Sequence, residues 1–125
     1  MNDQAIEQEI QAKGKTAPRV ASSDIASTIA SEHYFTAQHG VIGANFVLKQ
    51  GNPHPLDMFT PEPLALLTFC VLVLRNGFTV TGESACASPE NFDAEIGRKI
   101  ARANAVEKIW LLEGYLLKQR LHDAA

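Results

Sequence analysis

The chain has 125 residues, enough for one domain with its own hydrophobic core and too few for two domains of usual size. Apolar residues make up 46% and charged residues 20%, which is typical of a globular protein and excludes disorder of the whole chain. Eleven basic and 14 acidic side chains give a net charge of −3, so no global positive field attracts nucleic acid or anionic membranes.

Two cysteines are too few for a disulfide scaffold and favour a reducing compartment. The sequence starts without the basic and apolar regions of a signal peptide. Its longest nearly apolar run, residues 63–74, is far shorter than the ~20 residues of a membrane-spanning helix. We therefore expect a cytoplasmic protein with no membrane partner.

The N-terminal part divides into an arm and the start of a domain. Residues 1–21 are polar, and we expect a flexible N-terminal arm there, followed by a single α+β domain over residues 22–125. Ser22 or Ser23 can cap a helix, with Asp24 near the positive end of its dipole. The helical spacing of the apolar residues that follow predicts a helix over residues 23–34.

Glycines and prolines interrupt residues 35–63 throughout, which predicts a long loop. One apolar run within it, residues 45–48, predicts a short strand. Loops of this length in small domains are usually functional or mobile, so we interpret it as a family-specific insertion or a binding loop.

A β-hairpin is predicted around Asn76-Gly77, a dipeptide typical of the two-residue type I′ turn. That turn pairs Arg75 with Phe78 and Val73 with Val80. One face then carries Phe69, Val71, Val73, Phe78 and Val80, and the other carries Cys70, Leu72 and Leu74 beside Thr79, Thr81 and Glu83. The first strand is apolar on both faces, so we expect it inside a sheet or covered by a second subunit. The alternative is a buried helix over residues 63–74, capped by Asn76 or Gly77.

A long C-terminal helix is predicted to start at Ser88-Pro89, a capping hydroxyl followed by a proline at the first helical position. One stripe of this helix is mostly large and apolar, and we expect it to pack inward: Phe92, Ile96, Ile100, Ala103, Val106, Trp110, Leu117 and Leu121. A second stripe of small residues, Gly97, Ala101 and Ala105, allows close approach of another backbone. Gly114 indicates a bend or a close contact. A helix of ~45 Å exceeds what a globule of this size needs, which favours dimerisation or a kink.

Together these elements predict an α+β fold: an N-terminal helix and a β-hairpin, with room for a third short strand, packed on a long C-terminal helix. Residues 67–86, 89–93 and 109–117 resemble, in that order, a family of small tailed-bacteriophage and prophage proteins. The family is named after gene product 49 of a coliphage and gene product 66 of a Shigella phage. The resemblance covers about residues 16–121 and implies a phage-encoded accessory protein in the bacterial cytoplasm. It implies no established activity.

Two groups of side chains are candidates for ligand binding. Thr81, Glu83, Ser84 and Asn91 are polar groups at the predicted mouth between hairpin and helix, where they could orient a small molecule or satisfy a loop backbone. Arg98 and Arg102, one helical turn apart, form a basic patch with Lys99 and Lys108. This patch is either a solvated face or a contact for phosphate.

Other motifs point to structural roles. The hairpin register separates Cys70 from Cys86 beyond disulfide reach. The four histidines, His33, His39, His54 and His122, form no zinc pattern. Ser84 is followed by Ala85, but the second glycine that a Gly-x-Ser-x-Gly nucleophile elbow needs is absent. We therefore assign no catalytic residue, no metal and no cofactor.

Three hypotheses follow. The first is a non-enzymatic phage accessory protein that forms a homo-oligomer and binds a small phosphate-bearing ligand or a host protein, with a role in counter-defence. The second is a nucleotide or nucleic-acid binding protein that uses Arg98 and Arg102, which the acidic net charge disfavours. The third, a small enzyme using Glu83, Ser84 and His33, requires those groups to lie close together.

Overall fold

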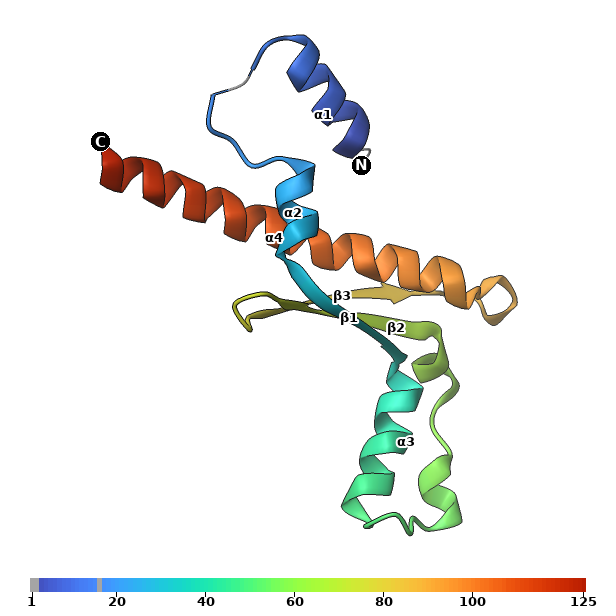
Figure 1. Ribbon diagram of the computed structural model, residues 1–125. Coiled ribbons are helices and arrows are strands. Elements are labelled where there is room, and N and C mark those ends of the chain that lie inside the picture. Colours follow the sequence, from blue (N-terminus) through green and yellow to red (C-terminus); the bar gives the residue numbers. More distant parts are fainter. Residues whose placement is uncertain (1–2, 16) are drawn as a thin grey trace.

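The computed structural model describes residues 3–15 and 17–125 and has an α+β fold (Figure 1). Strands β1 (Ile29–Thr36), β2 (Leu67–Leu74) and β3 (Thr79–Ala85) form an antiparallel sheet in the order β1-β2-β3. The long helix α4 (Ala94–Ala124) packs across one face of this sheet. Helix α3 (Ala37–Leu48) projects away from the end of the sheet, on the side opposite α4. Among the described helices, none has both the length and the apolar character needed to cross a bilayer.

The predicted hairpin is confirmed, and the alternative helix over residues 63–74 is wrong. A 3-10 turn, η2 (Glu62–Leu66), leads directly into β2. Strand β2 lies between β1 and β3, as expected for a strand with two apolar faces. Its side chains alternate between buried and half-buried, because α4 covers only one face of the sheet. The core lies between sheet and helix and consists of Ile25, Cys70, Leu72, Leu74, Val80, Ala101, Ala105 and Ile109.

The predicted hairpin register is wrong by one residue. The Leu74 N–H donates to the Phe78 carbonyl at 2.8 Å, so the loop has three residues instead of two. Within this loop only Gly77 has a positive φ, +88°, which excludes a type I′ turn. The shift moves each side chain of β3 to the other face. Leu72 therefore pairs with Val80 on the helix side. Thr79, Thr81 and Glu83 share the open face with the half-buried Phe69, Val71 and Val73.

Helix α4 packs through its small residues, not through the predicted large apolar stripe. Gly97, Ala101, Ala105 and Ile109 are its buried residues. Ile96 and Ile100, which we expected inside, are 55% and 47% exposed. The reason is Gly82 in β3: a Cβ built there would lie 2.2 Å from the Ala101 carbonyl oxygen and 2.3 Å from the Ala105 nitrogen. The helix backbone rests directly on the strand, as the small-residue stripe predicted.

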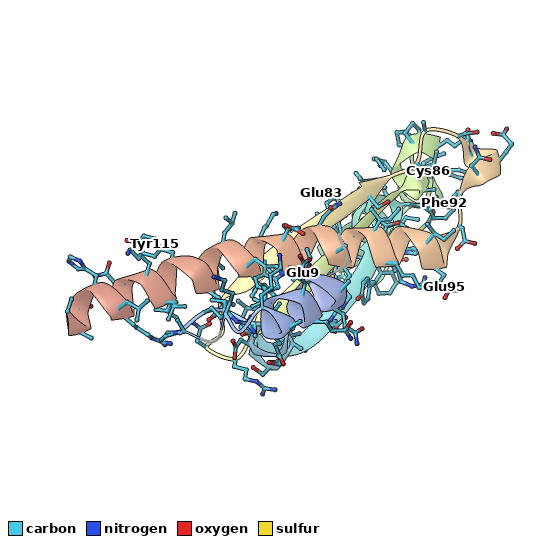
Figure 2. The ribbon with its side chains drawn as sticks, turned by 90° about the horizontal axis from the view of Figure 1, so that it is seen from above. Glu9, Glu83, Cys86, Phe92, Glu95 and Tyr115 are labelled. Atoms are coloured by element: carbon cyan, nitrogen blue, oxygen red, sulfur yellow. The ribbon has the colours of Figure 1, made fainter. Side chains whose placement is uncertain are left out.

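The start of α4 also differs from the prediction. Ser88-Pro89 opens a separate 3-10 turn, η3 (Pro89–Asn91), and the helix begins after Asp93, whose carboxylate accepts a hydrogen bond from the Ile96 N–H at 3.0 Å. At its other end the helix extends beyond the hairpin tip, with Tyr115 on the projecting part (Figures 1 and 2). A Cβ at Gly114 would meet nothing within 4 Å, so the close contact considered there is absent.

The predicted helix over residues 23–34 is a short helix followed by a strand. Helix α2 (Ser22–Thr28) contributes Ile25 to the core, and β1 then pairs with the free side of β2. The N-cap is Ala21, whose N–H donates to the Asp24 carboxylate at 2.8 Å, so neither serine is the cap. Pairing with a buried apolar strand outweighs the local helical pattern, and the consecutive aromatic residues Tyr34 and Phe35 favour a strand.

Residues 35–63 do not form the predicted loop with a strand at 45–48. Thr36 caps α3, which runs to Leu48, and the chain returns through a 3-10 turn, η1 (Pro55–Met58). Two glycines inside α3, Gly40 and Gly43, concealed its helical pattern, because glycine is normally a helix breaker.

The N-terminal arm contains helix α1 (Asp3–Ala12), which lies beside the middle of α4 (Figure 2). The Trp110 indole N–H donates to the Asp3 carboxylate at 3.3 Å, and the Arg19 guanidinium forms an ion pair with Glu7. No residue of α1 is buried, so the arm is held by polar contacts such as these and by a few half-buried apolar side chains. Its flexibility in solution stays a prediction.

The cap of α4 can be tested by two matched substitutions. We expect Asp93→Ala to lower the free energy of unfolding by about 1 kcal/mol, because the first turn loses its side-chain hydrogen-bond acceptor. Ser88→Ala, at the predicted but incorrect cap, should have a smaller effect. Urea denaturation measures both, and a larger loss for Ser88→Ala would contradict the assigned start of the helix.

The attachment of the arm should depend on pH. The hydrogen bonds from Arg19 lower the pKa of Glu7 from 4.5 to about 2. Because the pKa is lowered in the folded state, the pair stabilises the arm above pH 4.5 and the stabilisation is lost as the pH falls toward 2. We expect the fluorescence of Trp110 to report this release. Arg19→Gln should show the released signal already at neutral pH; an unchanged signal in that variant would contradict the contact.

Candidate functional site

A cleft of about 310 Å³ lies at the end of the sheet, where β1 runs into α3 and α4 begins. Its walls are formed where β1 leads into α3, where η2 leads into β2 and where η3 leads into α4. The apolar and aromatic lining residues are Tyr34, Phe35, Ala65, Leu66, Pro89, Phe92 and Ala94. The polar lining residues are Thr36, Gln38, His39, Thr68 and Arg98. Mostly apolar walls with a few polar groups are typical of small-molecule sites.

The α3 side of the cleft is fixed by a reciprocal cap. The His39 N–H donates to Thr36 Oγ1, and the Thr36 N–H donates to His39 Nδ1, both at 3.2 Å. The imidazole takes the place that Glu or Gln has in a capping box. Because Nδ1 is used in the cap, only Nε2 is available to a ligand.

On the α4 side the cleft is lined by Arg98, in the second turn of the helix. Among the described lining residues Arg98 is the only Lys or Arg. Across residues 3–15 and 17–125, Arg98 has neither an ion pair nor a side-chain hydrogen bond. Phe92 lies just before the helix, near its start in Figure 2. Helix α4 comes this close to the sheet because Gly97 faces Thr68: a Cβ at Gly97 would lie 3.0 Å from Thr68 Oγ1.

Arg102, one turn further along, is held in a network on the helix side of the sheet. Its Nε and Nη2 donate to the two oxygens of Glu32 at 3.0 and 3.3 Å, and the Tyr34 hydroxyl donates to Glu32 at 2.6 Å. The hydrogen bonds from Arg102, with that from Tyr34, lower the pKa of Glu32. Burial, together with the Glu32 carboxylate, raises the pKa of Tyr34. Arg102 therefore links α4 to β1.

The other predicted ligand-binding residues lie apart from this cleft. Thr81 and Glu83 are on the open face of the sheet, whereas Ser84 is on the helix side, paired with Thr68. Asn91 is exposed in η3. At the predicted mouth between hairpin and helix, the Asn104 side chain donates to the Glu83 carbonyl at 2.8 Å and Lys108 Nζ lies 3.5 Å from Thr81 Oγ1. Of the six residues, only Arg98 lines the cleft, and a ligand-binding role for all of them stays a prediction.

Most side chains of the predicted basic patch pair with neighbouring groups of the chain. Lys99 pairs with Glu95 at 3.3 Å, Lys108 contacts Thr81, and Arg102 pairs with Glu32. Arg98 is the member of the patch without such a partner in the described part of the chain. This pairing weakens the positive field that a nucleic-acid interface needs.

The residues of the enzyme hypothesis do not form a catalytic arrangement. Glu83 and Ser84 point to opposite faces of the sheet, and His33 is on the open face. There its Nε2 lies 3.0 Å from Ser31 Oγ, a pair that alternation along β1 brings together. Both residues are on an uncovered sheet face and line none of the cavities described for the structure. In the described residues, no cluster of His, Cys, Asp and Glu could hold a metal ion.

Both cysteines are free thiols, as the spacing predicted. Burial raises the pKa of Cys70, which keeps it a protonated core side chain and not a nucleophile. The cleft residues Tyr34, Thr36, His39, Thr68 and Phe92 were not predicted as ligand-binding. The sequence Thr36-Ala37-Gln38-His39 could have indicated a capped helix start there.

One family model matches this chain: the Phage protein (N4 Gp49/phage Sf6 gene 66) family, over residues 20–121. The matched segment includes the sheet, α3 and most of α4, and therefore the complete cleft. Neither the curated proteins nor the solved structures that were compared contain a match.

Proposed function

This chain belongs to the Phage protein (N4 Gp49/phage Sf6 gene 66) family, and we propose that it binds a small phosphate-bearing ligand in the Arg98 cleft without transforming it. The observation that carries this proposal is an unpaired guanidinium at the edge of a mostly apolar cleft. Arg98 is exposed, so in the free protein its guanidinium is solvated and is available to pair with an anionic ligand at the cleft.

The chemistry of the walls narrows the class of ligand. The planar guanidinium of Arg98 matches two oxygens of a phosphate group. The aromatic rings of Tyr34 and Phe92 suit a flat apolar group, such as a nucleobase. Thr68 and His39 add hydrogen-bonding groups to the lining. A mononucleotide or a cyclic dinucleotide combines both features.

Binding accounts for the cleft better than catalysis does. The only histidine of the cleft has its Nδ1 occupied by the cap of α3, and no carboxylate is among the lining residues. A general base oriented by a third group, which activates a nucleophile in most hydrolases, is therefore absent from the lining. A phage protein that sequesters a signalling nucleotide would act in counter-defence by lowering the concentration of that molecule in the host.

Isothermal titration calorimetry with nucleoside monophosphates and cyclic dinucleotides tests this proposal. We expect at least one of them to bind, and Arg98→Met to weaken its affinity about tenfold to a hundredfold, because a charged hydrogen bond contributes about 1.5 to 3 kcal/mol. Native mass spectrometry of protein from phage-infected cells would identify the ligand retained in the cell.

Lys99→Met is the matched control. It removes the same charge one residue away, from a side chain that pairs with Glu95 on the surface, and should leave affinity within about twofold. Equal weakening by both substitutions would indicate a diffuse charge effect and contradict a site at Arg98. Failure of every nucleotide to bind at micromolar concentration would also contradict the proposal.

A further inference from the structure

Helix α3 and its return segment form a limb, residues 37–59, that has unusual surface chemistry for a projecting element. No side chain of α3 is an Asp, Glu, Lys or Arg, and none of its residues is buried. Val47 and Leu48 are 73% and 77% exposed. Across the limb, Leu56, Met58 and Phe59 are exposed as well. A surface helix of a monomer normally carries charged residues on its solvent side, so this one has the composition of a covered helix.

The limb is an ordered unit and not a loose loop. The Asn45 side chain donates to the Asp57 carbonyl at 2.8 Å, which ties the helix to its return segment. The Gly51 N–H donates to the Phe46 carbonyl at 2.8 Å and closes the end of the helix. At the base, the Gln38 side chain donates to Thr60 at 3.3 Å. These contacts hold the apolar side chains in a defined arrangement that a partner could recognise.

The accessible surface of the chain is larger than that of a compact monomer of the same mass. Its accessible surface is 8728 Å². A compact monomer of 13.6 kDa would expose roughly 6,600 Å², so the chain exposes about 2,000 Å² more than expected. Obligate homodimers bury about 1,000 to 2,500 Å² on each subunit. This excess comes from all the projecting parts, namely the limb, the far half of α4 and the N-terminal arm, and it is large enough to include one subunit's share of such an interface.

We propose that a second copy of this chain covers the limb, so that the protein is a stable homodimer. A partner that associates only transiently meets a surface about as polar as the rest of the protein, whereas homodimer interfaces are more apolar. A helix without charged side chains also needs a partner as soon as it is made, and another copy of the same chain meets that need. A two-fold axis places the limb of each copy in one shared interface.

Light scattering coupled to size-exclusion chromatography tests the dimer on the full-length protein at micromolar concentration. We expect a mass twice the chain mass of 13.6 kDa. The double substitution Val47→Glu/Leu48→Glu should give a monomer with unchanged circular dichroism, because both side chains are exposed within one chain and buried only in the dimer. Phe59→Glu, on the return segment, provides a second variant should the first fail to fold.

Leu111→Glu is the matched control. Leu111 is 76% exposed on α4, outside the limb, and this variant should remain dimeric. A monomeric wild-type protein would overturn the proposal. So would a limb variant that folds and stays dimeric, because the interface would then lie elsewhere on the chain.

Discussion

The fold depends on how closely α4 approaches β3 at Gly82. The backbone of the helix occupies the place where any other residue would carry its Cβ, with Ala101 and Ala105 on the helix side of the contact. Nearer the start of α4, Gly97 faces the Thr68 side chain, and a Cβ there would lie 3.0 Å from Thr68 Oγ1. Most of the buried apolar side chains that the sheet offers its helix come from β2, and β3 adds Val80. Close approach of the backbones allows Leu72, Val80 and Ile109 to pack together.

This contact also sets the position of the candidate site. Because α4 is pressed onto the sheet along its first half, Arg102 reaches Glu32 on β1, and Arg98 comes to the edge of the cleft. The other half of α4 and the limb extend beyond the sheet, which leaves apolar surface uncovered at both ends of the molecule (Figure 1). The proposed homodimer would cover the part of this surface that lies on the limb.

The sequence predicted well those features that local chemistry controls. The Asn76-Gly77 dipeptide located the hairpin, and the spacing of Gly97, Ala101 and Ala105 predicted a close backbone contact. It failed where tertiary contacts decide. The pattern over residues 23–34 suits a helix, but residues 29–36 are stabilised more as strand β1, by pairing with β2. Ile96 and Ile100 look like core residues, yet the contact at Gly82 turns the neighbouring stripe of small residues on α4 toward the sheet. The cleft was missed because its lining comes from six separate elements and the segments between them, a convergence that spacing along the chain does not reveal.

The free energies of unfolding of Gly82→Ala and Gly114→Ala, measured side by side, test the central contact most directly. The added methyl group at position 82 meets helix backbone, which has no flexible end to move aside, so the variant should lose about 3 kcal/mol or more. The same methyl group at position 114 meets open space in a helix and should raise stability by up to about 1 kcal/mol. Opposite signs are the predicted result. A Gly82→Ala protein as stable as the wild type would contradict the account.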